Sequence, residues 1–147
     1  MLNGRDSANW EERNVRNVLY CVYMEHPKAI GDRTTLAVML ALQAKGFTVL
    51  LPFGENTRYD LVIDDGTRLS RVQCKTGRYH RGAVIFPACS TYRHHRNPPT
   101  PGRHYLGEID YFAVYWPKSG AVYLIPIEDA AVKRQGALRV SPPRNGQ

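Results

Sequence analysis

The stretch from Asp60 to Thr76 limits the possible folds more than any other part of this 147-residue chain. Two runs that read as β-strands, 60–64 and 68–76, flank the dipeptide Asp65-Gly66. Aspartate followed by glycine is typical of tight hairpin turns, because such turns need a positive φ. The pattern therefore predicts two antiparallel strands, and the fold has to include a β-sheet.

The neighbouring segments predict the rest of an α/β domain. Residues 31–47 are rich in alanine and leucine and end near Gly46, which predicts a helix with Asp32 or Thr34 as its N-cap. Further predicted elements are a strand over 47–53, a strand over 83–89, a loop over 91–105, a hairpin of 109–117 with 121–127, and a short helix over 128–136. This order predicts a mixed β-sheet flanked by helices.

The length fits a single domain with additions at both ends. We expect an N-terminal helical extension over 1–27, a globular domain over 28–140 and a flexible tail over 141–147. The chain has three cysteines, an odd number, and they are far apart, which favours reduced thiols and a cytoplasmic location. No apolar run approaches the roughly 20 residues that span a bilayer, so no membrane partner is expected.

The charge distribution points to a polyanionic partner. The formal net charge is +7, and the stretch from Gly66 to Gly107 contains arginines and histidines but no acidic residue. A protein surface of this kind attracts nucleic acid. The alternative is an ordinary solvated basic face.

The predicted hairpin brings several polar side chains to one face. If the strands pair about Asp65-Gly66, Asp60 lies opposite Arg71 and diagonal to Gln73. Side chains alternate along a strand, so Gln73 and Lys75 share the face of Asp60. A slip of one residue would separate them.

These groups suit metal-assisted hydrolysis of a phosphodiester. The Asp60 carboxylate, the Gln73 amide oxygen and the Cys74 backbone carbonyl are hard oxygen ligands of the kind that Mg²⁺ prefers. A bound cation polarises the phosphoryl group, and the neighbouring Lys75 stabilises charge or orients water. The alternative is that Asp60 bonds local amides at the start of a strand and Lys75 is solvated.

The spacing of Asp60, Gln73 and Lys75 resembles the D-x(n)-(D/E)-x-K signature of the PD-(D/E)XK nuclease superfamily. Within it, the segments "GDRTTLAVMLALQAKGF", "RYDLVIDDG", "RVQCKTGR" and "GEIDYFAVY" resemble the small endonucleases associated with group I introns, which are similar in core to archaeal Holliday-junction resolvases. The resemblance covers residues 28–129. Three positions depart from the pattern: Tyr59 replaces proline, Gln73 replaces an acid, and Thr34-Thr35 stands where a helix glutamate is common.

The resemblance implies a restriction-endonuclease-like core and a Mg²⁺-dependent DNA endonuclease, with Mn²⁺ as a substitute. Its catalytic residues would be Asp60, Gln73 and Lys75. The metal ligands would be Asp60, Gln73 and the Cys74 carbonyl, with Asp32 either as a further ligand or as a helix cap. Cutting both strands of a duplex implies a homodimer or a higher oligomer. The alternative is a module that binds nucleic acid and no longer cuts it.

Basic residues around this site are the expected phosphate contacts, because guanidinium binds phosphate bidentately. They are Arg58, Arg71, Arg78, Arg81, Arg93, His94, His95 and Arg96. Glu108 and Asp110 either add ligands to the metal or hold the arginine-rich face in place, and we favour the second interpretation.

Overall fold

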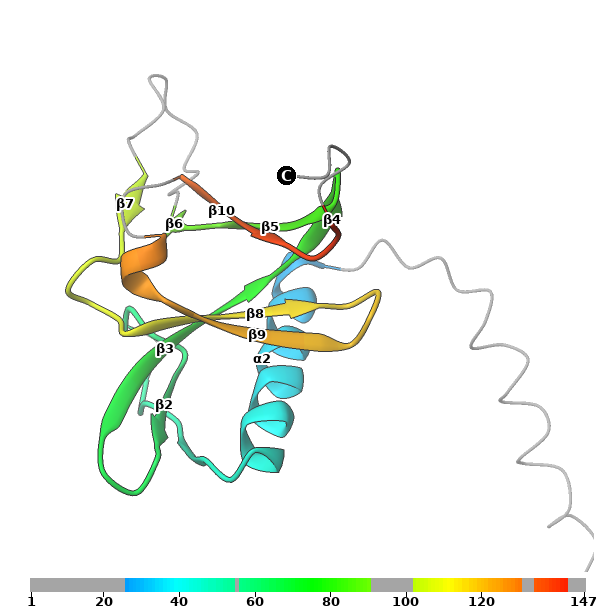
Figure 1. The fold of residues 1–147 in the computed structure, drawn as a ribbon. Helices are drawn as coiled ribbons and strands as arrows, with labels where there is room; N and C mark the ends of the chain where they lie inside the picture. Colours follow the sequence, from blue (N-terminus) through cyan, green and yellow to red (C-terminus); the bar gives the residue numbers. More distant parts are fainter. Residues whose placement is uncertain (1–25, 55, 91–101, 131–133, 143–147) are drawn as a thin grey trace, which may run out of the picture.

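The computed structural model describes residues 26–54, 56–90, 102–130 and 134–142, and the structural statements below refer to these ranges. Its centre is a five-stranded sheet in the order β1-β2-β3-β8-β9 (Figure 1). The strands are β1 (Thr48–Leu50), β2 (Leu61–Asp64), β3 (Leu69–Thr76), β8 (Tyr111–Trp116) and β9 (Ala121–Pro126). Strands β3 and β8 are parallel and the other pairs are antiparallel, so the predicted mixed sheet is confirmed.

Helix α2 (Pro27–Ala44) covers one face of this sheet, and it begins four residues before the predicted start. Proline suits the first turn of a helix because its missing N–H has no partner there in any case. The side chain of His26 accepts a hydrogen bond from a first-turn N–H at 3.3 Å. Asp32 and Thr34 therefore lie inside the helix, and the prediction that either of them caps it is wrong.

A second, three-stranded sheet covers the other face, so the molecule has three layers (Figure 1). Its strands lie in the order β10-β5-β4, with bounds β4 (Arg78–His80), β5 (Ala83–Pro87) and β10 (Gln135–Arg139). A smaller pair is formed by β6 (Cys89–Ser90) and β7 (Arg103–His104). Phe86 on β5 and Phe112 on β8 are buried against one another, with ring centroids 5.5 Å apart.

The short helix predicted over 128–136 is wrong. Within the described residues of this segment, the structure has one 3₁₀ turn, η1 (Ile127–Asp129), and the start of strand β10, which pairs with β5. Gly136 lies directly against the ring of the buried Phe86, where any larger side chain would collide. Pairing with the free edge of β5 determines the secondary structure of this segment, and the local amino-acid composition does not predict such long-range pairing.

The first hairpin is confirmed, but its turn lies one residue later than predicted. Asp64 pairs with Leu69, which centres the turn on Gly66-Thr67 instead of Asp65-Gly66. Gly66 supplies the positive φ, at 89°. The carboxylate of Asp65 accepts hydrogen bonds from two N–H groups of the turn, both at 2.8 Å, so this residue closes the loop through its side chain.

The register of the two strands is consequently shifted by two residues. Leu61 pairs with Val72 at the end of the ladder, and the N–H of Asp60 donates to the Val72 carbonyl at 2.9 Å, so Asp60 does not lie opposite Arg71 as predicted. A shift of two leaves every side chain on its predicted face. The side chain of Asp60 reaches that of Gln73 in this register.

No helix within the described ranges is both long enough and apolar enough to cross a membrane.

Candidate active site

Asp60, Gln73 and Lys75 lie on the same face of the main sheet, as the sequence predicts. Along β3, Val72 and Cys74 are buried against α2, whereas Gln73 and Lys75 alternate with them and face the other way. Asp60 immediately precedes β2 on the neighbouring strand. All three side chains are half-buried, so the site is supported by the fold and remains open to solvent.

Hydrogen bonds join the three oxygen-bearing groups. Nε2 of Gln73 donates to Oδ2 of Asp60 at 2.5 Å, and the Cys74 backbone N–H donates to the same oxygen at 2.7 Å. The Cys74 carbonyl oxygen lies 3.5 Å from Nε2 of Gln73. A carboxylate, a side-chain amide and a backbone carbonyl therefore meet at one point.

The Asp60 carboxyl group is partly removed from water. Burial raises its pKa above the usual value of 3.8, against the opposing effects of the Cys74 N–H, the charge of Lys75 and the Gln73 amide. Burial raises the pKa of a carboxyl group because it disfavours the charged form. The ionised carboxylate thus lacks full compensation from the protein and is suited to a cation.

The donor set fits a hard divalent cation whose remaining ligands come from elsewhere. Carboxylate, amide and carbonyl oxygens are the groups that Mg²⁺ accepts, and Mg²⁺ usually keeps several waters. No group of three or more acidic, histidine or cysteine side chains gathers in the described part of the chain. In the present arrangement Gln73 presents its N–H to Asp60, so a cation would require the amide oxygen in its place.

Asp32 and the Cys74 thiol stand apart from these groups. Asp32 is exposed on α2, the helix that covers the opposite face of the sheet, and its role as a further ligand stays a prediction. Burial and the nearby Asp60 raise the pKa of Cys74 to about 12. The thiol therefore stays protonated at neutral pH, and Cys74 offers only its carbonyl.

Lys75 is held by a residue that the sequence analysis missed. Its Nζ donates to the hydroxyl of Tyr105 at 3.0 Å and lies 4.8 Å from the centre of the same ring. Tyr105 is only 4% exposed and meets Phe112 edge to face at an angle of 86°. It lies within the segment 91–105 predicted as a loop, and no spacing in the sequence connects it with Lys75.

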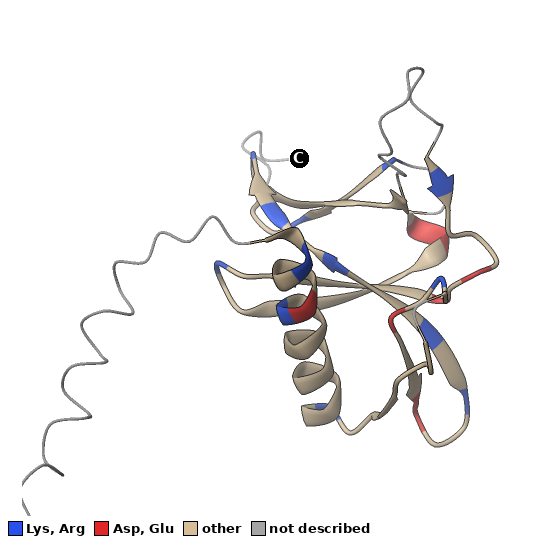
Figure 2. Ribbon diagram, turned by 180° about the vertical axis from the view of Figure 1, so that it is seen from behind, with Lys and Arg blue, Asp and Glu red and all other residues tan. Residues whose placement is uncertain are grey.

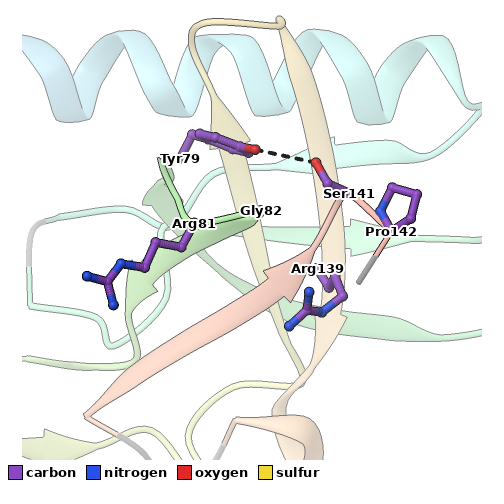
Figure 3. A pocket seen from close by; sticks show the side chains of 6 residues that line it. All are labelled: Tyr79, Arg81, Gly82, Arg139, Ser141 and Pro142. Atoms are coloured by element: carbon purple, nitrogen blue, oxygen red, sulfur yellow. Dashed lines mark hydrogen bonds between the residues drawn. The ribbon is translucent and has the colours of Figure 1, made fainter. Parts of the chain in front are cut away.

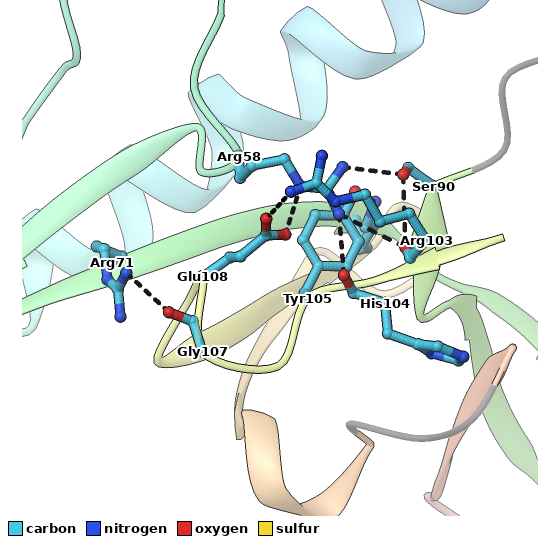
Figure 4. A network of polar contacts seen from close by, with 9 residues as sticks. Arg58, Arg71, Ser90, Arg103, His104, Tyr105, Gly107 and Glu108 are labelled. Atoms are coloured by element: carbon cyan, nitrogen blue, oxygen red, sulfur yellow. Dashed lines mark hydrogen bonds and ion pairs between the residues drawn. The ribbon is translucent and has the colours of Figure 1, made fainter.

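Arg58 also lies against the ring of Tyr105, and its guanidinium group is engaged in contacts within the protein (Figure 4). Its guanidinium carbon lies 4.2 Å from the ring centre of Tyr105, and its Nε donates to Glu108 at 2.6 Å. The remaining contacts go to the Ser90 hydroxyl and to the backbone carbonyls of Arg103 and His104. Arg58 therefore ties several segments together, and the structure gives no support to its predicted role as a phosphate contact.

Glu108 and Asp110 hold arginines, which is the interpretation that we favoured from the sequence. Arg58 lowers the pKa of Glu108 through its hydrogen bond, and Arg103 pairs with the second carboxylate oxygen. Burial alone would raise the pKa of Asp110, but the hydrogen bonds and charge of Arg71, with the charge of Arg68, lower it overall. Arg71 also donates to the Gly107 carbonyl at 3.2 Å, as Figure 4 shows.

The other expected phosphate contacts fall into two groups. Arg78 and Arg81 are exposed on β4 and in the turn after it. The predicted contacts Arg93, His94, His95 and Arg96 lie outside the described residues.

Comparisons with known proteins agree with this geometry. A family model described as PD-(D/E)XK endonuclease matches residues 25–147. Among solved structures, the chain is similar to the bacterial homing endonuclease I-Ssp6803I, with a TM-score of 0.60 and 22% sequence identity over 83% of this chain and 81% of that chain. A comparison with curated proteins found no match. The restriction-endonuclease-like fold expected from the sequence is confirmed.

Proposed function

Because the chain belongs to the PD-(D/E)XK endonuclease family, we propose that it hydrolyses phosphodiester bonds of DNA with the help of Mg²⁺, for which Mn²⁺ can substitute. One observation carries this proposal: Asp60, Gln73 and Lys75 share an open face of the sheet, with the first two in contact. The odd number of cysteines, which favours reduced thiols, supports a cytoplasmic setting.

Each residue has a distinct task in the proposed reaction. Asp60, Gln73 and the Cys74 carbonyl hold the cation, whose chemistry is to polarise the phosphoryl group and to activate water. Lys75 places an ammonium group beside the same point, where it stabilises negative charge that grows on the phosphate oxygens during attack. Tyr105 fixes the direction of Lys75 through its hydroxyl and its ring.

One observation favours the alternative of a binding module without cleavage. Within the described residues, Asp60 is the only carboxylate in the polar cluster around Gln73 and Lys75. The nearby carboxylates of Glu108 and Asp110 are paired with arginines. A site with one carboxylate binds its cation weakly until a DNA phosphate adds oxygen ligands. Both functions predict salt-sensitive DNA binding, and only the first predicts cleavage.

Double-strand cleavage would need two such sites, so we propose a homodimer or a larger oligomer as the active form. The target is either a duplex sequence or a branched junction. Because phosphate contacts do not specify sequence, the described side chains do not select between these targets.

The test is a cleavage assay on linear, supercoiled and four-way-junction DNA with Mg²⁺, Mn²⁺ or EDTA. We expect cleavage by the unmodified protein with either metal and none in EDTA. Lys75→Ala should cut about 10²- to 10³-fold more slowly while binding DNA normally. Lys118→Ala, an exposed lysine in the turn between β8 and β9, is the control and should cut at the normal rate. DNA binding without cleavage under every metal condition would establish the binding module instead.

A further inference from the structure

We infer that a pocket at the end of the second sheet binds a backbone phosphate of the nucleic acid, away from the cleavage site. The inference rests on the proposed function only for the nature of the ligand. The pocket is concave, contains unpaired arginines and an aromatic wall, and has an unusual backbone conformation at Arg81.

The pocket has a volume of about 480 Å³, which is in the range of sites that hold a small ligand. It is lined by Tyr79, Arg81, Gly82, Arg139, Ser141 and Pro142 (Figure 3). The chain that leaves β10 crosses the turn between β4 and β5, where the N–H groups of Val140 and Ser141 both donate to the Gly82 carbonyl, at 3.0 and 3.2 Å. Two segments far apart in sequence thus build one concave site.

The two arginines of this pocket have no carboxylate partner. Neither guanidinium group forms an ion pair or a hydrogen bond with another residue that the structure describes. The arginines nearer the cleavage site differ, because Glu108 or Asp110 pairs with each of them: Arg58, Arg68, Arg71 and Arg103. Positive charge that is free to meet an anion therefore lies at Arg81 and Arg139.

The surrounding sheet face extends this charge. His80, Ala83 and Arg139 are paired across the three strands and project from the outer face, and Arg78 lies on the same face. No aspartate or glutamate occurs on β4, β5 or β10, in agreement with the charge colouring of Figure 2. A surface of this composition fits a polyanion.

An aromatic wall completes the pocket. The ring of Tyr79 stacks on Trp116 with centroids 5.6 Å apart and an angle of 12°, yet Tyr79 is 48% exposed. Its hydroxyl lies 3.4 Å from the Ser141 hydroxyl. A pocket that is lined by an exposed, stacked ring and by two arginines matches a nucleotide unit, in which a sugar or a base adjoins a phosphate.

The backbone gives a further reason to assign a role to Arg81. Its φ is 46°, the left-handed region that residues other than glycine adopt infrequently. A glycine would fit this turn position at lower cost, so the geometry does not explain the arginine. Residues kept in such conformations cluster at ligand-binding sites. We therefore attribute the presence of Arg81 to its side chain.

The experiment measures binding of a fluorescent DNA duplex in EDTA, where no cleavage interferes, over a series of salt concentrations. The test variant combines Arg81→Gly with Arg139→Gln. The matched control combines Lys45→Gln with Lys118→Gln, which removes the same charge from exposed positions outside the pocket. Thermal unfolding of both variants verifies the fold, and Arg81→Gly should not lower the Tm because glycine accepts the positive φ.

We expect the test variant to bind about tenfold more weakly or worse near 0.1 M salt, and the slope of log K against log salt to fall by about one, the value for the loss of one phosphate contact. The control should change far less. The inference is overturned if the test variant and the control have equal affinities and slopes. If the unmodified protein binds DNA without cutting it, only the proposed function is contradicted. If the arginine variant binds and cuts normally, only this inference is contradicted. Absence of DNA binding by the unmodified protein contradicts both.

Discussion

At the scale of single residues, the site depends on one tyrosine, Tyr105, whose ring contacts two cationic side chains. Lys75 and Arg58 both lie against the ring of Tyr105, at 4.8 and 4.2 Å from its centre, and Lys75 also donates to its hydroxyl. A lysine has four rotatable bonds in its side chain, so the direction of its ammonium group depends on such contacts. The burial of Tyr105 makes this support rigid.

Replacing Tyr105 by phenylalanine should therefore slow cleavage and leave DNA binding intact. The change removes the hydroxyl that accepts the Lys75 hydrogen bond and keeps the ring that packs on Phe112. A bond of about 1–1.5 kcal/mol corresponds to roughly a tenfold fall in kcat. Tyr123→Phe is the control, because its hydroxyl makes no hydrogen bond within the described residues, and its kcat should be unchanged. Equal kcat for both variants would contradict the positioning role.

Asp60 should reduce stability in the absence of metal. Its pKa in the folded protein lies above the unfolded value of 3.8 because of burial, so the folded state binds more protons between the two values. The free energy of unfolding then decreases as the pH rises through that window and stays low above it. Asp60→Asn removes this decrease in the free energy of unfolding. In EDTA at neutral pH, the Tm of the variant should therefore equal or exceed that of the unmodified protein. A clear fall in Tm would show that the hydrogen bonds of the carboxylate outweigh its burial.

The same substitution should abolish metal-dependent cleavage, because an amide lacks the negative charge that attracts the cation. In the unmodified protein, metal binding should weaken as the pH falls through the raised pKa of Asp60. Calorimetric titration with Mn²⁺ across a pH series measures this dependence.

At the scale of elements, the hairpins and strand β5 follow from the sequence, whereas the pairing of β5 with β4 and β10 in a second sheet does not. Both hairpins of the main sheet were predicted because alternating side chains and turn residues are local signals. The first two residues of β10 were predicted as the end of a helix, because the local sequence does not show that Gly136 lies against the ring of Phe86, a residue 50 positions earlier. Tyr105 was missed for the same reason, because its partner Lys75 belongs to another element.

The predicted position of the first turn was wrong by one residue, but this error did not change which side chains share a face at the site. The sequence correctly placed Asp60, Gln73 and Lys75 on one face, although the predicted pairing was shifted by two. The face of the sheet on which a side chain lies depends on whether its position in the strand is odd or even. A shift of two residues in the pairing register therefore leaves the face unchanged. The contact between the Asp60 and Gln73 side chains depends on the observed register, which follows from the turn that the Asp65 side chain closes.

Gly136→Ala should destabilise the second sheet. A methyl group at this position would collide with the ring of Phe86, which is 2% exposed and packed on Phe112, so the ring has no room to move. Overpacking of this kind costs about 1–3 kcal/mol. Gly31→Ala is the matched control, because a methyl group there meets nothing within 4 Å and alanine favours the helix. In chemical denaturation, the midpoint should fall for the first variant and rise for the second.

At the scale of the whole molecule, α2 presents apolar side chains to the outside. Leu36 and Leu40 lie one helical turn apart and are 65% and 70% exposed. An apolar stripe of this kind is suited to contact between subunits, which the proposed double-strand cleavage needs.

Leu36→Lys combined with Leu40→Lys should therefore shift the protein to a smaller species in size-exclusion chromatography with light scattering. Leu69→Lys, at a leucine 61% exposed on the first hairpin, controls for the added charge and should leave the mass unchanged. A mass that is the same for all proteins would exclude this stripe as the subunit contact.

The continuity of β3 with β4 limits the distance between Lys75 and the pocket at Tyr79. Only residues 76–78 separate Lys75 from Tyr79, and a fully extended chain covers that interval in at most about 14 Å. DNA advances about 3.4 Å per nucleotide of a strand, so the interval corresponds to about four nucleotides. If the pocket anchors a phosphate and Lys75 acts in cleavage, the anchored phosphate therefore lies within a few nucleotides of the bond that is cut.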